Sequence, residues 1–153
     1  MTFILSKRSL DKLEGVDERL VQVVLTAINL TEVDFGVIEG VRSIARQKEL
    51  VNSGASQTMK SKHIEGKAID LIAYVGTRIS WELSLYDDIA EAMKESAREN
   101  GLAVRWGGSW SVPDIRFWNG TMERAMNSYI DSCRSLGKKP FIDGPHFEIS
   151  SKN

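Results

Sequence analysis

The chain contains very few of the residues from which many functional sites are built. Cys133 is the only cysteine in 153 residues, so no disulfide can form within the chain and a cysteine-rich zinc site is excluded. The net charge of −1 gives no strong positive field for nucleic acid or an anionic membrane. No run of about 18 apolar residues occurs, so no membrane-spanning helix is expected. The apolar run 3–5 ends before Lys7 and is too short for the core of a signal peptide.

The remaining composition is that of an ordinary globular domain. Apolar residues make up 42% of the chain and charged residues 27%. A chain of this length forms one domain and can bury a sizeable core without disulfides. We therefore expect a single domain over residues 1–153.

Hydrophobic periodicity predicts a mixture of helices and short strands. Helices are expected over residues 17–30, 44–52, 81–100 and 122–136, and strands over 35–41, 68–75, 102–106, 141–142 and 146–149. Residues 1–15 are expected to be irregular apart from a short helical turn. Ser43 is the expected N-cap of the second helix, and Gly54, Gly101 and Gly137 are placed to end helices. Because strands and helices do not alternate strictly, the sequence predicts an α+β fold with a small, mostly antiparallel sheet flanked by helices.

The two histidines of the chain each lie close to an aspartate. His63 precedes the predicted strand that contains Asp70, and His146 follows Asp143 at the start of the last predicted strand. A carboxylate within an apolar strand is costly unless it is paired or binds a metal. Imidazole and carboxylate both suit Zn²⁺, and a catalytic zinc site needs three protein ligands and one open position. His63, Asp70 and His146 are therefore candidate ligands of a zinc site on the sheet, with Asp143 as a candidate general base.

Spacing alone leaves other interpretations of these residues open. Most histidines are surface or hydrogen-bonded core residues, and such His/Asp spacings occur by chance. Glu65 and Glu148 are rival ligands or bases. Glu148 would share a strand face with His146, which favours a role as a buried ion-pair partner or an orienting partner for a ligand histidine. Arg42 has a planar guanidinium that suits a carboxylate or an oxyanion, and the alternative is an exposed salt bridge at a strand end.

The run from Ser61 to Asp70 matches the pattern S-x-H-x-x-G-x-A-x-D. With Asp143-x-x-His146 downstream, this order of motifs resembles that of the LAS-type zinc peptidases. That family includes VanY-like D-Ala-D-Ala carboxypeptidases, dipeptidases and the L-alanyl-D-glutamate peptidases of bacteriophage endolysins. The segment 35–50 and the run Trp106-Gly107-Gly108 are similar to the endolysin branch. The resemblance covers most of residues 9–149.

The resemblance implies roles for seven residues of this chain. They are the metal ligands His63, Asp70 and His146, the catalytic residues Asp143 and Arg42, and the substrate contacts Ser61 and Gln47. The three ligands would hold one Zn²⁺ per chain. Asp143 would activate water and then protonate the leaving amine, and Arg42 would lie near the scissile carbonyl or a substrate carboxylate.

The implied function is that of a zinc-dependent peptidoglycan peptidase, a phage endolysin that hydrolyses the L-alanyl-D-glutamate bond of the stem peptide and lyses the host cell wall. The implied partner is the peptidoglycan stem peptide, without nucleic acid or membrane insertion, and a monomer is expected. Without a signal peptide, the enzyme would stay in the host cytoplasm until lysis and then act in the cell wall or periplasm. The alternatives are a D-Ala-D-Ala carboxypeptidase of cell-wall metabolism and a non-catalytic, zinc-containing wall-binding relative.

The sequence departs from the endolysin pattern in two places. Ser109 stands where an acidic residue usually follows Trp-Gly-Gly, and a long segment with a predicted helix separates Trp-Gly-Gly from the final motif. We therefore expect an insertion at about 109–140 that reshapes the substrate groove, in a single catalytic domain without a separate wall-binding domain. Trp110, Trp118 and Tyr129 are candidate lining residues of this groove or packing residues.

Overall fold

The computed structural model describes residues 2–153 and shows an α+β fold, as the sequence predicts. In chain order the elements are α1 (Lys7–Lys12), α2 (Glu18–Leu30), β1 (Phe35–Glu39), α3 (Ile44–Asn52), β2 (Ala68–Val75), β3 (Arg78–Ser80), α4 (Leu83–Asn100), β4 (Val104–Trp106), the 3-10 helix η1 (Ile115–Phe117), α5 (Met122–Ser135) and β5 (His146–Ile149). Local signals set several helix ends. Ser43 caps α3 by accepting a hydrogen bond from the Arg46 N–H, and Gly101 ends α4 in the left-handed conformation.

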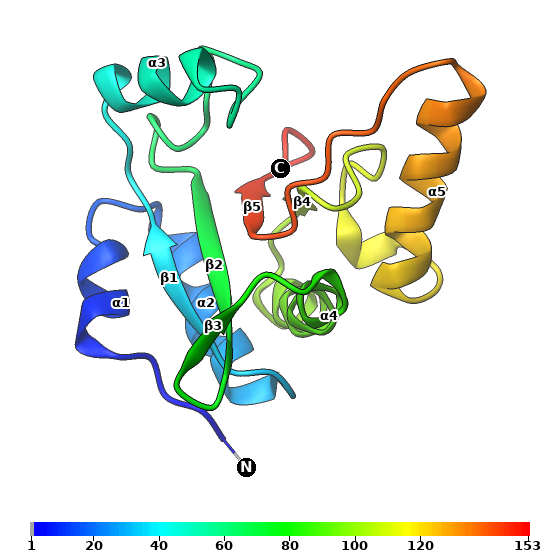
Figure 1. Ribbon diagram of the computed structural model, residues 1–153. Helices are drawn as coiled ribbons and strands as arrows, with labels where there is room; N and C mark the ends of the chain where they lie inside the picture. The colour runs from blue at the N-terminus through cyan, green and yellow to red at the C-terminus, as the bar shows by residue number, and fades with distance from the viewer. Residues whose placement is uncertain (1) are drawn as a thin grey trace.

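The five-stranded sheet is antiparallel throughout and pairs β2, from the middle of the sequence, with β5, near its C-terminal end (Figure 1). Its strand order is β1-β2-β5-β4, and β3 forms a hairpin with the far end of β2. In the β2–β5 pair, Asp70 lies opposite His146 and Ala68 lies opposite Glu148. In the next pair, Arg105 on β4 lies opposite the same Glu148. Since side chains alternate between the faces of a strand, Asp70, His146, Glu148 and Arg105 share one face of the sheet.

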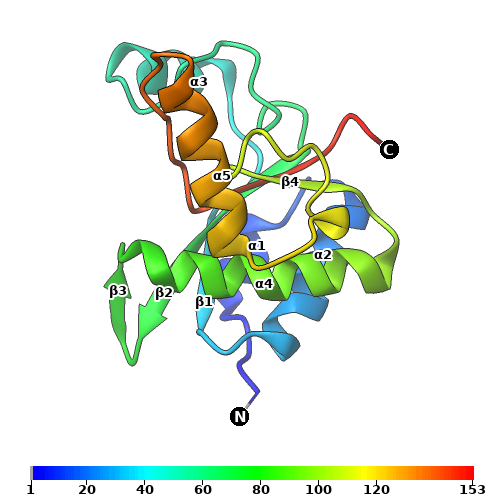
Figure 2. The same ribbon diagram turned by 90° about the vertical axis from the view of Figure 1, so that its right-hand side faces the viewer.

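The opposite face of the sheet forms the hydrophobic core with α2 and α4. Ile69, Leu71, Trp106 and Phe147 are fully buried there, and each contributes roughly 1.5–3 kcal/mol through removal of apolar surface from water. Figures 1 and 2 show α4 running beneath the sheet, and α5 runs at a steep angle to α4. The helices α3 and α5 lie on either side of the β2–β5 pair. The sheet face that carries His146 therefore lies between two helical regions.

Several local predictions differ from the structure, and the strand predicted over 102–106 begins only at Val104. Residues 141–142, predicted as a strand, do not pair in the sheet, because the Phe141 N–H donates to the Tyr129 hydroxyl instead. The strand predicted over 35–41 ends at Glu39, where a register shift in the β1–β2 ladder turns the chain away. The hairpin strand β3 was not predicted, because it is only three residues long and largely exposed.

The segment 109–140 is fixed to α4 by partly buried polar contacts. The Lys94 ammonium donates to the carbonyls of Trp118 and Gly120 at 2.8 and 2.9 Å, and the Glu91 carboxylate accepts from the Met122 N–H at 2.9 Å. These contacts attach the start of α5 to the middle of α4. Within residues 2–153 no helix is both long enough and apolar enough to span a membrane.

Candidate metal centre

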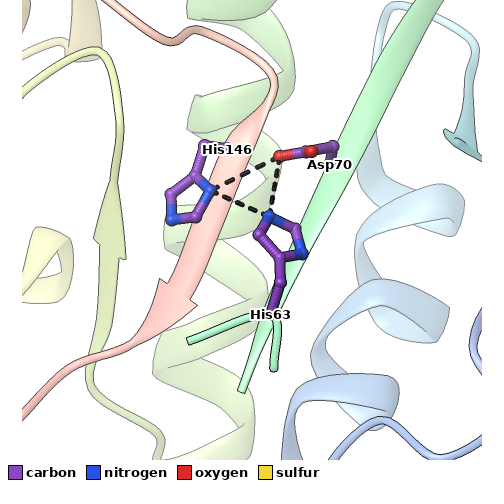
Figure 3. Close-up of side chains that lie close together, drawn as sticks. All are labelled: His63, Asp70 and His146. Carbon is purple, nitrogen blue, oxygen red and sulfur yellow. Dashed lines mark hydrogen bonds and ion pairs between the residues drawn. The ribbon is translucent and has the colours of Figure 1, made fainter. Parts of the chain in front are cut away.

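Three donor atoms from His63, Asp70 and His146 form a nearly equilateral triangle (Figure 3). The distances are 3.2 Å between His63 Nε2 and His146 Nδ1, 3.3 Å between His63 Nε2 and Asp70 Oδ1, and 3.4 Å between His146 Nδ1 and Asp70 Oδ1. Donors bound at roughly 2.0–2.1 Å to a tetrahedral zinc ion lie about 3.3–3.4 Å apart. Within residues 2–153, Asp70 Oδ1 is buried without a hydrogen-bond partner. The donor set therefore fits a metal ion.

The second nitrogen of each imidazole is held by a hydrogen-bond acceptor. His63 Nδ1 lies 2.9 Å from the Gly40 carbonyl oxygen, and His146 Nε2 lies 2.8 Å from Glu148 Oε1. When these nitrogens donate, the lone pairs of the other two point into the triangle. Glu148 is also paired with the Lys62 ammonium at 3.2 Å. Glu148 is thus the buried partner of His146 that the strand pattern favoured.

The charges in the centre shift the pKa values of several of its groups. Burial alone would raise the pKa of Asp70, but the close imidazoles of His146 and His63 hold it well below its usual range, so the carboxylate is ionised as a ligand must be. Burial would lower the pKa of His146, but Asp70 and Glu148 raise it to about 9. Burial, reinforced by the negative charge of Asp70, raises the pKa of Asp143 to about 6.

The turn that carries Asp143 is fixed by the run Trp106-Gly107-Gly108. The Gly107 N–H donates to the His146 carbonyl at 2.8 Å, and the Asp143 N–H donates to the Gly107 carbonyl at 2.9 Å. The Trp106 indole N–H donates to the Gly144 carbonyl at 2.7 Å. A Cβ at Gly107 would lie 2.3 Å from the Asp143 carbonyl oxygen, so only glycine allows this close approach.

A pocket of about 740 Å³ opens above the three candidate ligands. His63, Asp70, Asp143 and His146 all contribute to its lining, and so do residues of the segment 55–62. Further lining residues are Arg105, Trp110, Tyr129 and Phe141. Trp110 and Tyr129 therefore lie where the sequence placed groove residues, whereas Trp118 lines a separate pocket next to Phe117.

The predicted catalytic residue Arg42 is buried in the wall of this pocket. Its guanidinium donates to Glu39 at 2.7 and 2.8 Å, to Gln47 Oε1 at 2.6 Å and to Asp70 Oδ2 at 3.3 Å. With 8% of its surface exposed, it is not the exposed strand-end salt bridge considered as the alternative. The structure thus brings Arg42 next to a candidate metal ligand, and its catalytic role stays a prediction.

The two predicted substrate contacts are placed differently. Ser61 lines the pocket, and its hydroxyl accepts a hydrogen bond from the His63 N–H at 3.2 Å. Gln47 is fully buried and is not among the residues that line the pocket. Its amide group joins Arg42 to Ser56 and to the Thr58 carbonyl. This placement favours a role for Gln47 in holding the loop and the arginine in position.

Three pocket residues were not singled out by the sequence. Glu39 and Lys62 pair with site residues, and Arg105 enters the pocket from β4. Lys62 lies inside the 61–70 motif, and Arg105 directly precedes Trp106-Gly107-Gly108, so adjacency to a motif was the only available signal. Their contacts depend on strand pairing, which no local pattern reveals.

Comparison with known proteins places this chain in a family. The family model for phage L-alanyl-D-glutamate peptidase matches residues 1–150. The L-alanyl-D-glutamate peptidase of Escherichia phage T5 is 31% identical, over 97% of this chain and 99% of that protein. The enzyme of the same name from Listeria phage A118 is 37% identical over 75 residues, which are 49% of this chain and 26% of that protein.

A solved structure agrees with this assignment. The crystal structure of the Serratia marcescens L-Ala D-Glu endopeptidase ChiX superimposes with a TM-score of 0.73 at 35% sequence identity, covering 97% of this chain and 92% of that chain. The match of sequence and fold extends through both halves of the candidate metal centre. The chain is therefore a peptidase that belongs to the phage L-alanyl-D-glutamate peptidase family.

Proposed function

We propose that this peptidase hydrolyses the L-alanyl-D-glutamate bond of the peptidoglycan stem peptide with one Zn²⁺ held by His63, Asp70 and His146. The observation that carries the proposal is the triangle of donor atoms at the base of the pocket, with edges of 3.2 to 3.4 Å. Two imidazoles and one carboxylate are a ligand set typical of catalytic zinc, which keeps a further position open. The same donors suit magnesium or calcium poorly, because these ions prefer oxygen ligands.

The residues around the triangle supply the acid–base chemistry. A bound zinc ion would contribute Lewis acidity, which activates water and polarises a carbonyl group. Asp143 lines the same pocket and is half-buried. We assign to its carboxylate the removal of a proton from the attacking water and the return of that proton to the leaving amine.

Arg42, Ser61 and Gln47 have supporting roles in this proposal. The Arg42 guanidinium is held by Glu39 and Gln47 in the pocket wall, so it can stabilise developing negative charge on the scissile carbonyl without reorganising. The pocket position of Ser61 supports its role as a substrate contact. Gln47 acts on the substrate indirectly, through Arg42 and the loop at 56–58.

We propose that the enzyme acts on the wall as a monomer and as a single catalytic domain. The three candidate ligands, Asp143 and the pocket residues all come from one chain, which supports a monomer. Trp110 and Tyr129 support a groove-shaping role for the segment 109–140. As an endolysin, the protein would remain in the host cytoplasm until lysis and then reach the wall.

The test compares the wild type with Asp143→Asn on purified peptidoglycan, each with and without metal. Chelation is expected to abolish the release of new amino groups, and zinc is expected to restore it. Asp143→Asn should bind one zinc ion and keep its fold but lose at least about 100-fold in rate, the usual scale for an acid–base group. Asp131→Asn, at an exposed position on α5, is the matched control and should keep full activity. Full activity of Asp143→Asn would contradict the assigned role.

A further inference from the structure

Four basic side chains line the pocket, and two of them are paired with carboxylates whereas two are not. Arg42 is paired with Glu39 and Asp70, and Lys62 is paired with Glu148. Lys60 is exposed on a polar loop and has no ion pair among residues 2–153. Arg105 likewise forms no ion pair with any carboxylate in this range, although it is half-buried. A half-buried guanidinium without an anionic partner therefore lines the active-site pocket.

Arg105 is held in a fixed position on the metal side of the sheet. Its Nε and Nη2 groups donate to the Trp110 carbonyl, the Nε bond being 3.0 Å long. Its Cζ lies 4.9 Å from the centre of the Trp110 ring, which in turn lies 5.2 Å from the centre of the His146 ring. These two contacts place the guanidinium no more than about 10 Å from a candidate metal ligand, the length of roughly three residues of extended chain.

The neighbour that could neutralise Arg105 is already engaged. Glu148 lies directly opposite Arg105 in the β4–β5 ladder. Its two carboxylate oxygens are instead taken by His146 at 2.8 Å and Lys62 at 3.2 Å. An arginine has five N–H donors, and the Trp110 carbonyl accepts from only two of them. Arg105 therefore keeps free donors and an uncompensated charge, which suit a carboxylate.

The proposed substrate must bring such a carboxylate to the pocket. Glutamate has two carboxyl groups, and its amino group is part of the L-alanyl-D-glutamate bond. At most one of the two carboxyl groups can continue the peptide, so the other remains free beside the scissile bond. Three carboxylates, those of Asp70, Asp143 and Glu148, lie in the same pocket, so a substrate carboxylate is unfavourable beside them unless a cation meets it.

We propose that Arg105 forms the subsite for the free carboxylate of the D-glutamyl residue and thereby selects for glutamate on the leaving side of the bond. This inference rests on the proposed function. Lys60 is the other unpaired cation, but its exposed ammonium is flexible and strongly hydrated, whereas the Arg105 fork is already oriented.

The experiment uses two matched stem peptides, one with the free D-glutamyl carboxylate and one with that group as a carboxamide. The metal-loaded wild type is expected to prefer the acid by about 10- to 100-fold in kcat/KM, because the amide leaves Arg105 without its anion. Arg105→Gln should cleave the two peptides equally well, and Arg105→Lys should recover part of the preference. Lys60→Gln is the control and should keep the wild-type ratio.

The acid-to-amide ratio separates recognition from a structural role of Arg105. Loosening of the Trp110 loop would slow both peptides alike, and zinc content measured on each variant shows whether the metal centre is intact. The subsite would be contradicted if Arg105→Gln kept the wild-type ratio, or if the wild type cleaved both peptides without preference. Neither result would contradict the proposed function. If the wild type cleaved neither peptide at the L-alanyl-D-glutamate bond, both the proposed function and the proposed subsite would be contradicted.

Discussion

At the residue scale, the orientation of the two histidines depends on what their second nitrogens contact. His63 is held by the Gly40 carbonyl and His146 by the Glu148 carboxylate. A backbone carbonyl is fixed by the fold, whereas a carboxylate can be changed by one substitution. Glu148 is therefore the position at which the support of the candidate metal centre can be tested without removing a candidate ligand.

Glu148→Gln is expected to weaken zinc binding by about 10- to 100-fold, the usual effect of losing a carboxylate behind a ligand histidine. The amide keeps the size of the side chain but neither its charge nor its pairing with Lys62. Competition with a chromophoric chelator measures the affinity. Glu65→Gln, the same change at an exposed glutamate, should leave the affinity unchanged. Equal affinities for the wild type and Glu148→Gln would show that Glu148 does not support the ligand.

Residue identity made the three candidate ligands predictable. The chain has only two histidines, and an aspartate inside an apolar strand needs a compensating partner. Arg105 and Lys62 gave no comparable signal, because lysine and arginine residues occur throughout the chain. What distinguishes them is the pairing of β4 with β5 and of β2 with β5, which the sequence does not encode locally.

At the scale of elements, the turn that directly precedes β5 determines where Asp143 lies. Gly107 touches the backbone of this turn, and any side chain there would meet the Asp143 carbonyl, at 2.3 Å from Cβ. A backbone atom cannot move aside as a flexible side chain does. The position of the proposed base, Asp143, therefore depends on the absence of a side chain at Gly107.

Gly107→Ala is expected to displace Asp143, to cost about 1–3 kcal/mol of stability as overpacked sites do, and to lower kcat/KM by at least tenfold. The matched control is Gly137→Ala, at a glycine with φ +69° and open space around it. The control should lose about 1 kcal/mol from backbone strain but keep its activity. Thermal unfolding and peptidoglycan hydrolysis measure the two effects. A fully active Gly107→Ala would show that the turn tolerates displacement.

The helices were more predictable than the short strands. Apolar periodicity and caps located α2, α3, α4 and α5 to within two residues. β3 and the unpaired residues 141–142 were misassigned, because over two or three residues the hydrogen bonds of the tertiary structure decide the conformation. The register of β2 against β5 is likewise a tertiary property, and it is this register that completes the candidate metal centre.

At the scale of the whole molecule, the contact between α4 and α5 contains a buried carboxyl group that opposes stability. Asp87 on α4 is 8% exposed, and within residues 2–153 its Oδ1 has no hydrogen-bond partner. Burial, with the nearby charge of Glu123, raises the pKa of Asp87 to about 6. The folded state thus binds the proton more tightly than the unfolded state. This group therefore destabilises the fold above pH 6 and ceases to do so as the pH falls toward 4.

Asp87→Asn is expected to raise the free energy of unfolding by about 1–2 kcal/mol at pH 7.5, and most of this gain should disappear at pH 4. Urea unfolding at the two pH values measures it. Asp131→Asn, at an exposed position, should change stability little at either pH. A gain for Asp87→Asn that did not depend on pH would show that the carboxylate charge is not its cause.

The whole site consists of two halves that lie far apart in the sequence, one in the middle of the chain and one near its C-terminal end, and they meet at the β2–β5 pair. We propose that this combined site cuts the L-alanyl-D-glutamate bond. Mass spectrometry of purified peptidoglycan after digestion by the zinc-loaded protein tests it most directly. We expect stem peptides with new D-glutamate N-termini, absent from digests with Asp143→Asn. Release of free D-alanine without new D-glutamate N-termini would contradict it.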